Sequence, residues 1–227
     1  MRLRRHDGPL LRIGHRGAAA LAPANSLRAL ELALEAGVDI VEIDVLGLPG
    51  RGLVLSHSSR EVAPDALPLD DALAILAAQP SVGLLADVKN GGYERELVEA
   101  MRNHGLVDRA LVSTMDLSIL RQVKRLDPGV RRSVTYPRNR ARAAALRRAP
   151  TLLPWRIAAL VLRAEASVAT LNYRVVTRSV VERCHDLGAA VFAWTVNDPA
   201  LVARLDGLGV DGVITDDPSV FQAIFQA

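Results

Sequence analysis

Three carboxylates lie within apolar segments that have the character of β-strands. Glu42 and Asp44 belong to segment 39–45, and Asp87 lies near the end of segment 81–89. Residues two apart on a strand point to the same face, so Glu42 and Asp44 would both face the interior of a barrel. Carboxylates in such an interior stay charged only beside a compensating cation. Three such groups suit one divalent cation, Mg²⁺ or Ca²⁺, because both prefer oxygen ligands. The alternative is interior carboxylates held by arginines or backbone amides.

Two histidines end neighbouring apolar segments, His15 after the first of them and His57 after residues 53–56. In phosphodiester cleavage one histidine can take up a proton while a second donates one, so we expect these two to act as a pair. Either histidine alone would more often be structural. Gly14 and Gly17, which flank the first histidine and its neighbour, would allow a close approach of the backbone to a ligand and unusual backbone angles. The remaining histidines lie in the N-terminal tail or on predicted helices and are expected to be structural: His6, His104 and His185.

Two cationic side chains, Arg16 and Lys89, also lie at strand ends, beside the predicted histidine and carboxylate positions. Both suit phosphate oxygens, and arginine can bind them with two parallel hydrogen bonds. Pairing with the neighbouring carboxylates is an alternative role that is compatible with the first. In barrel enzymes the carboxyl ends of the strands carry the chemistry, which favours a function for this set together with Thr195 and Asn197.

The elements that must position these residues alternate between short β-type runs and longer helical ones. Such alternation predicts βα units around a parallel sheet. The predicted strands cover 11–15, 39–45, 81–89, 109–114, 130–136, 167–172, 189–196 and 211–215. Segment 53–57 would be a minor extra strand. The predicted helices cover 26–37, 70–79, 93–105, 116–126, 177–188, 198–209 and 217–225. Eight units without internal repeats predict one α/β domain over residues 1–227, a closed (β/α)8 TIM barrel.

The overall composition supports a single enzyme-like domain rather than a nucleic-acid or membrane-spanning protein. The 227 residues are 50% hydrophobic and carry a net charge of only +3, with no block of like charges typical of a nucleic-acid arm. Cys184 is the one cysteine, so an intrachain disulfide is excluded, and we expect a buried helical thiol. The basic N-terminus is too poor in apolar residues for a signal peptide, and we therefore expect a cytoplasmic protein.

Residues 137–165 form a long excursion between two predicted strands, with seven arginines, one acid and the apolar run that contains Trp155. We favour a barrel helix plus an extra packing helix, with the arginines facing water. A lid over the site is one alternative, because long connections in compact domains are often functional. Weak contact of a basic amphipathic piece with an anionic membrane surface is another.

The motifs that contain these residues resemble the glycerophosphodiester phosphodiesterase family. The resemblance runs in order along nearly the whole chain, through residues 14–17, 23–26, 42–45, 57, 87–89, 111–114, 194–197 and 209–218. It implies a (β/α)8 barrel, a divalent metal, and hydrolysis of a small-molecule glycerophosphodiester to an alcohol and glycerol 3-phosphate.

The resemblance also implies a role for each of the candidate residues. His15 and His57 become the acid–base pair, and Glu42 and Asp44 become metal ligands. Arg16 and Lys89 become phosphate contacts. A mechanism similar to that of phosphatidylinositol-specific phospholipase C would use the glycerol 2-hydroxyl as the nucleophile, with a cyclic phosphate opened by water. Which histidine is the acid is left open by the sequence.

Three departures from the family pattern bear on the site, besides the conservative Ser26 for Thr and an Arg51–Gly52 turn where Asp–Gly is common. Ala24 replaces the usual Glu, and Ser58 replaces the usual Asp after the second histidine, which would weaken the orientation of a neighbouring group. Asp87 replaces the usual Glu and is one methylene shorter, so it would bind a metal through water or need a closer strand. We expect activity, either slow or with altered metal preference.

Two other functions are compatible with the sequence. The basic segment 137–165 and the short stretch between His57 and Asp87 favour a lysophospholipase D-like activity on a lipid phosphodiester. The three departures favour a weakly catalytic barrel that binds a phosphorylated ligand. Turnover of lipid without turnover of glycerophosphocholine would support the first, and binding without turnover would support the second. The oligomeric state is left open.

Overall fold

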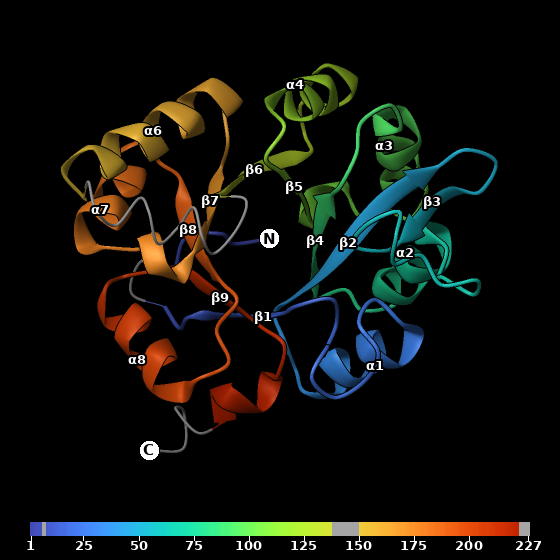
Figure 1. Ribbon diagram of the computed structural model, residues 1–227, viewed down its shortest axis with the longest axis horizontal. Coiled ribbons are helices and arrows are strands. Elements are labelled where there is room, and N and C mark those ends of the chain that lie inside the picture. Colours follow the sequence, from blue (N-terminus) through green and yellow to red (C-terminus); the bar gives the residue numbers. More distant parts are fainter. Residues whose placement is uncertain (6–7, 138–149, 223–227) are drawn as a thin grey trace.

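A computed structural model of the protein, which describes residues 1–5, 8–137 and 150–222, is a barrel of parallel strands (Figure 1). Within these residues eight parallel strands close on themselves through the pairing of β1 with both β2 and β9. The strands of the closed barrel are β1 (Leu11–Gly14), β2 (Ile40–Leu48), β4 (Gly83–Val88), β5 (Ala110–Thr114), β6 (Arg131–Tyr136), β7 (Val168–Asn172), β8 (Ala190–Trp194) and β9 (Gly212–Thr215). The predicted (β/α)8 fold is therefore confirmed.

Helices follow the strands and form the outer ring of the barrel (Figure 1). They are α1 (Leu27–Glu35), α2 (Leu69–Ala77), α3 (Glu94–Asn103), α4 (Leu117–Leu126), α6 (Leu153–Ala164), α7 (Arg178–Asp186) and α8 (Pro199–Gly207). Several begin at a capping side chain that accepts a backbone N–H of the first turn, as Ser26 does for α1 and Thr177 for α7. Short 3₁₀ turns complete the connections at Val107–Arg109, Pro150–Leu152, Tyr173–Val175 and Pro218–Phe221.

The apolar side chains form two separate cores. The larger lies between the strands and the surrounding helices and contains residues such as Leu30, Leu73 and Val180. The smaller fills the interior of the barrel. Its buried members are Leu11, Ile13, Ile40, Leu85, Leu111, Val168, Ala190, Phe192 and Ile214. Because the lumen is filled by side chains, it is a packed core, and only its carboxyl end is available for a site.

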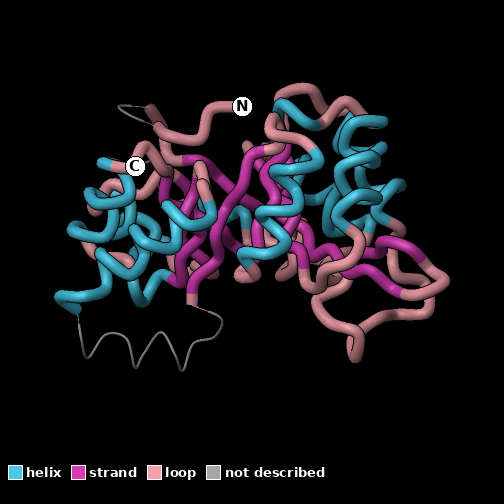
Figure 2. The backbone as a smooth tube through the Cα atoms, turned by 90° about the horizontal axis from the view of Figure 1, so that it is seen from above, coloured by secondary structure: helices cyan, strands magenta, loops and turns pink. Residues whose placement is uncertain are grey.

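The segment predicted as a minor strand is β3 (Gly52–Leu55), which pairs antiparallel with the far end of β2. This pairing explains why β2 extends to Leu48 rather than ending at residue 45 as predicted. The two strands form a hairpin that projects from the carboxyl end of the barrel (Figure 2). Because the hairpin turns the chain back along β2, His57 lies beside Asp44 in the middle of that strand.

The apolar run of the 137–165 excursion is α6, which packs its inner face against the barrel between β6 and β7. The preferred interpretation of a barrel helix is thus correct for residues 153–164, and the predicted additional helix falls on residues outside the described part of the chain. His6, residues 138–149 and the end of the predicted helix 217–225 also lie outside it.

Candidate active site

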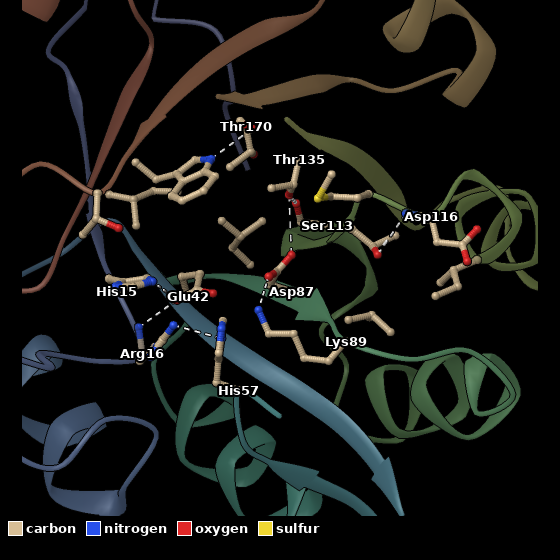
Figure 3. Close-up of a pocket in the computed structure, with 18 of the residues that line it drawn as sticks. His15, Arg16, Glu42, His57, Asp87, Lys89, Ser113, Asp116, Thr135 and Thr170 are labelled. Carbon is tan, nitrogen blue, oxygen red and sulfur yellow. Dashed lines mark hydrogen bonds and ion pairs between the residues drawn. The ribbon is translucent and has the colours of Figure 1, made fainter. Parts of the chain in front are cut away.

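A cavity of about 700 Å³ opens at the carboxyl end of the barrel, where the sequence places the polar residues (Figure 3). Six of the seven predicted site residues line it: His15, Arg16, Glu42, His57, Asp87 and Lys89. The seventh, Asp44, lies beneath them and is only 1% exposed. The structure therefore brings all seven together, although they are supplied by four different segments.

The three carboxylates form one cluster. Glu42, Asp44 and Asp87 each offer an oxygen atom, and these atoms lie within 4.8 Å of one another. Asp44 of β2 stands opposite Asp87 of β4 in the sheet register, so the shorter Asp87 side chain still reaches the cluster. Oδ1 of Asp44 is buried, and the Lys89 ammonium group lies 2.5 Å from it. A donor set made only of carboxylate oxygens fits a hard divalent cation.

Both cationic side chains lie against this cluster. The Lys89 ammonium group is 2.5 Å from Oδ1 of Asp44 and donates a hydrogen bond to Oδ2 of Asp87. Nε of Arg16 lies 2.8 Å from Oδ2 of Asp44, but this ion pair lacks hydrogen-bonding geometry. Thus Lys89 and Arg16 balance the buried negative charge, which was the alternative role considered for them.

Burial and the neighbouring charges give the groups of the cluster different pKa values. Burial raises the pKa of Glu42 to about 7, and the nearby negative charge of Asp44 adds to this effect. Burial would also raise the pKa of Asp44, but the hydrogen bond from His57 and the positive charge of Lys89 outweigh it and hold that pKa well below its usual range. Burial opposes the charge of Lys89, yet the surrounding carboxylates raise its pKa above the ordinary value. The cluster therefore contains one carboxyl that titrates near neutrality and one that stays ionised.

His15 is fixed by a partner that the sequence analysis did not single out. Its Nδ1 lies 2.6 Å from Oδ1 of Asp216, while its Nε2 lies 3.9 Å from Oε2 of Glu42. Burial lowers the pKa of His15, but Glu42 and the hydrogen bond to Asp216 outweigh burial and raise it. Asn197 in turn donates a hydrogen bond to Asp216 at 2.6 Å. Such carboxylate support orients the imidazole ring and fixes which ring nitrogen carries the proton.

His57 is more exposed, and its Nδ1 lies between two competing partners. Nη2 of Arg16 is 2.9 Å away and Oδ2 of Asp44 is 3.2 Å away. One ring nitrogen can accept from the guanidinium or donate to the carboxylate, but it cannot do both. The two contacts therefore correspond to two protonation states of Nδ1, one supported by Arg16 and the other by Asp44.

A buried asparagine holds Asp44 in place. The Asn25 side chain donates to Oδ2 of Asp44 and accepts the Asp44 backbone N–H, both at 3.0 Å. Asn25 and Arg16 are both in the left-handed backbone region, with φ of 62° and 51°, and the Asn25 N–H donates to the Arg16 carbonyl. Residues other than glycine adopt this region at a cost that is often found at functional sites.

The glycines beside His15 allow close backbone packing, and Gly17 has the unusual backbone conformation that was expected, with φ of 81°. A Cβ added at Gly14 would lie 2.5 Å from the Gly17 carbonyl oxygen, and one added at Gly17 would lie 2.5 Å from the Ala29 backbone. They therefore allow the loop after β1 to fold tightly against α1.

Hydroxyl groups line the opposite wall of the cavity (Figure 3). Ser113 and Thr135 are joined by a 2.6 Å hydrogen bond, and Thr135 also donates to Asp87 at 3.5 Å. Thr170 lies beside the Trp194 indole, whose N–H donates to the Thr170 carbonyl at 3.2 Å. This wall of hydroxyl groups, which also includes Asp116 at the start of α4, was not predicted.

The residues expected to be structural are so where the structure describes them. His104 pairs with Asp70 and His185 with the buried Asp211, each at 2.8 Å. The Cys184 thiol is fully buried on α7, and burial raises its pKa to about 12.

The fold and this cavity together define a barrel enzyme of the phosphodiesterase type, and comparison with known proteins agrees. The sequence profile of the glycerophosphoryl diester phosphodiesterase family matches residues 15–63 and 71–220. The chain therefore belongs to this family, whose members are phosphoric diester hydrolases. This result confirms the resemblance found in the sequence.

Individual relatives are distant in sequence but similar over their full length. A glycerophosphodiester phosphodiesterase of Caldanaerobacter subterraneus is 26% identical over 91% of this chain and 93% of the relative. A putative glycerophosphoryl diester phosphodiesterase from Silicibacter pomeroyi superimposes with a TM-score of 0.81 at 24% identity, covering 99% of this chain and 95% of that one. A phosphodiesterase from Oleispira antarctica, solved in complex with the product sn-glycerol-3-phosphate, gives a TM-score of 0.76 at 22% identity and covers 96% and 97%. At these identities the solved structures support the fold.

Proposed function

We propose that this protein hydrolyses a glycerophosphodiester to an alcohol and glycerol 3-phosphate, with a divalent cation bound in the cavity. The proposal rests on one observation. His15, His57 and the three carboxylates lie together at one cavity at the carboxyl end of the barrel. Relatives that share the fold are described as glycerophosphodiester phosphodiesterases, and one was solved with glycerol 3-phosphate.

Glu42, Asp44 and Asp87 are the proposed ligands of the cation, either Mg²⁺ or Ca²⁺. When bound, such an ion would neutralise charge that develops on the phosphoryl oxygens and lower the pKa of a coordinated hydroxyl. Arg16 and Lys89 are the proposed phosphate contacts. Since both now pair with the carboxylates, a cation in the cluster would compete for those carboxylates and leave the two side chains to the phosphate.

His15 and His57 are the proposed proton carriers. The glycerol 2-hydroxyl attacks phosphorus, its proton passes to one histidine, and the bond from phosphorus to the departing alcohol breaks as the other histidine protonates that oxygen. Water then opens the cyclic phosphate with the histidine roles reversed. Asp216 keeps Nε2 of His15 directed toward the cavity, and Arg16 and Asp44 support the two states of His57.

The proposal is tested by following release of glycerol 3-phosphate from glycerophosphocholine and glycerophosphoethanolamine by ³¹P NMR. We expect cleavage by the wild type and none by His15→Ala or His57→Ala. An analogue without the glycerol 2-hydroxyl should bind but resist cleavage, and its hydrolysis at the normal rate would exclude the cyclic phosphate. If the folded wild type cleaves neither natural diester with any divalent cation, the proposal is wrong.

A lipid phosphodiester is the second candidate substrate. Part of the cavity lining is apolar, through Met115, Ile119 and Trp194, and it could accommodate a short stretch of hydrocarbon. The rates of cleavage of lysophosphatidylcholine and glycerophosphocholine, measured at equal concentration, distinguish the two candidate substrates. Faster cleavage of the lipid would favour a lysophospholipase D-like activity.

A further inference from the structure

Helix α6 is apolar on two sides, although the barrel covers only one of them. Its inner face, which packs against the barrel, consists of Leu153, Ile157, Ala158, Val161 and Ala164. A second row faces solvent, and its members recur at helical spacing: Leu152, Trp155, Ala159 and Leu162. We refer to these four residues as the outer stripe.

The outer stripe contains three of the five large hydrophobic side chains that are exposed among the described residues. Leu152 is 63% exposed, and Trp155 and Leu162 are each 60% exposed. Among the residues that the structure describes, only Leu21 and Leu27 are comparable large hydrophobic side chains, and they belong to the α1 region across the barrel from α6 (Figure 1). Isolated exposed leucines are ordinary, but a continuous row along one helix marks an interaction surface.

Arginines flank the stripe. Arg156 and Arg163 are exposed on one side of it along α6. On the other side Arg183 of α7 stacks on the Trp155 ring, with its guanidinium carbon 3.8 Å from the ring centroid. Acidic groups are also close, since Glu182 and Asp186 line the hollow beside Trp155 and Asp186 pairs with Arg183 at 3.7 Å.

The sequence that leads into α6 adds more positive charge. Residues 138–149 contain five arginines and no acid. Within the described residues no helix is long and apolar enough to cross a membrane. A helix with tryptophan and leucine along one row and arginines beside it has the composition of a helix that lies in the interface of an anionic bilayer.

We propose that the outer stripe of α6 docks the protein on an anionic lipid surface. Leu152, Trp155 and Leu162 enter the boundary between headgroups and acyl chains, while the neighbouring arginines contact the anionic headgroups. Pairing of two copies through the same stripe is less favourable, because a two-fold interface would bring the arginines of one copy close to those of the other. In a barrel the first turn of a helix that follows a strand lies at the carboxyl end, so the start of the stripe is on the side of the cavity mouth.

Vesicle binding tests the proposal. The wild type is mixed with vesicles of phosphatidylcholine alone or of phosphatidylcholine with phosphatidylglycerol, and bound protein is measured by flotation. Tryptophan emission is recorded in parallel, because Trp155 should move to shorter wavelength as it leaves water. We expect binding to the anionic vesicles only, and weaker binding at high salt.

Three variants identify the surface. Leu152→Ser with Leu162→Ser keeps Trp155 as the reporter and should abolish both binding and the emission shift. Arg156→Gln with Arg163→Gln should weaken binding by about fivefold for each arginine removed. Leu27→Ser, an exposed leucine on α1, is the matched control and should bind as the wild type does. All three should melt at the wild-type temperature, since the changed side chains are exposed.

The proposal fails if the wild type does not bind anionic vesicles, or if the double leucine variant binds as well as the wild type. It also fails if the wild type is a dimer without lipid and the leucine variant is a monomer, because the stripe would then be a self-association surface.

Discussion

The two walls of the cavity differ in kind, although they belong to one barrel. The wall formed by β1, β2, β4 and the segment that follows β3 carries the seven candidate residues, and each of them contacts another: His15, Arg16, Glu42, Asp44, His57, Asp87 and Lys89. The wall formed by β5, β6 and β7 offers hydroxyl groups that bond to one another, as between Ser113 and Thr135. The charged wall can transfer protons and bind a cation and a phosphate, whereas the hydroxyl groups of the second wall can hold an alcohol without disturbing those charges. We therefore expect substitutions on the first wall to lower activity far more than substitutions on the second.

The largest effect is expected for the proton carriers of the charged wall. His15→Gln and His57→Gln retain hydrogen-bonding capacity but cannot shuttle a proton, so kcat should fall by roughly 10²–10⁴-fold. Steady-state kinetics with glycerophosphocholine measure this loss. Ser113→Ala on the opposite wall is the matched control and should lose less than about tenfold. Equal losses on both walls would contradict the division of roles.

A smaller loss is expected for the partner that orients His15. Asp216→Asn keeps the hydrogen-bonding geometry but removes the charge, so kcat should fall by about 10–100-fold while KM changes little. The same substitution should lower the pKa of His15, because Asp216 is one of the groups that raise it. NMR titration of the imidazole in metal-free protein detects this shift. An unchanged titration together with unchanged kcat would show that Asp216 is only structural.

The buried carboxyl of Glu42 makes stability depend on pH in metal-free protein. Its folded-state pKa of about 7 lies above the ordinary value, so the folded state holds a proton that the unfolded state has released between these two pH values. Stability should therefore fall as pH rises from 5 to 8, with Tm decreasing by about 2–4 °C per kcal/mol lost. His15, whose pKa is also raised, acts in the same sense, so Glu42→Gln should flatten the profile only in part.

Added Mg²⁺ or Ca²⁺ should reverse this trend. A cation binds the ionised carboxyl, so it should raise Tm more at pH 8 than at pH 5. Thermal melts in EDTA and in each cation measure the difference. Equal stabilisation at both pH values, or none, would argue against Glu42 as a ligand.

The smallest effect is expected on the hydroxyl wall. Thr135→Val removes a hydrogen bond to Ser113 and a long one to Asp87 but leaves the shape of the cavity nearly unchanged. We expect KM to rise by a factor of about 2–10 with kcat retained, the cost of one neutral hydrogen bond. A large drop in kcat would mean that Thr135 supports Asp87 during the reaction, and the two walls would then act as one unit.

The sequence predicted the fold and the charged wall because both depend on local patterns. The alternation of β-type and helical segments indicates the barrel. In such a barrel, polar residues at the carboxyl ends of the strands lie at the same end, wherever those strands occur in the chain. Glu42 and Asp44 were predictable as a pair, since strand geometry alone places them on the same face.

The partners that hold these residues depend on three-dimensional contacts. Asp216 reaches His15 because β9 closes the barrel against β1, although the two residues are 201 positions apart in the chain. Its place directly after the last strand, within the family motif at residues 209–218, was the signal that could have identified it. Asn25 belongs to the family motif at residues 23–26, but its hydrogen bonds to Asp44 require a left-handed backbone that no residue pattern specifies. No sequence pattern distinguished the serine and threonine residues of the hydroxyl wall, because these residue types are common in strands.

The cation dependence of turnover tests the central claim most directly. Protein stripped of metal with EDTA is assayed for release of glycerol 3-phosphate, and Mg²⁺ or Ca²⁺ is then added back, in parallel with Asp44→Asn protein. The account predicts negligible turnover without metal, recovery with at least one of the two cations, and no recovery in the variant. Undiminished turnover in EDTA, or full recovery by Asp44→Asn, would contradict it.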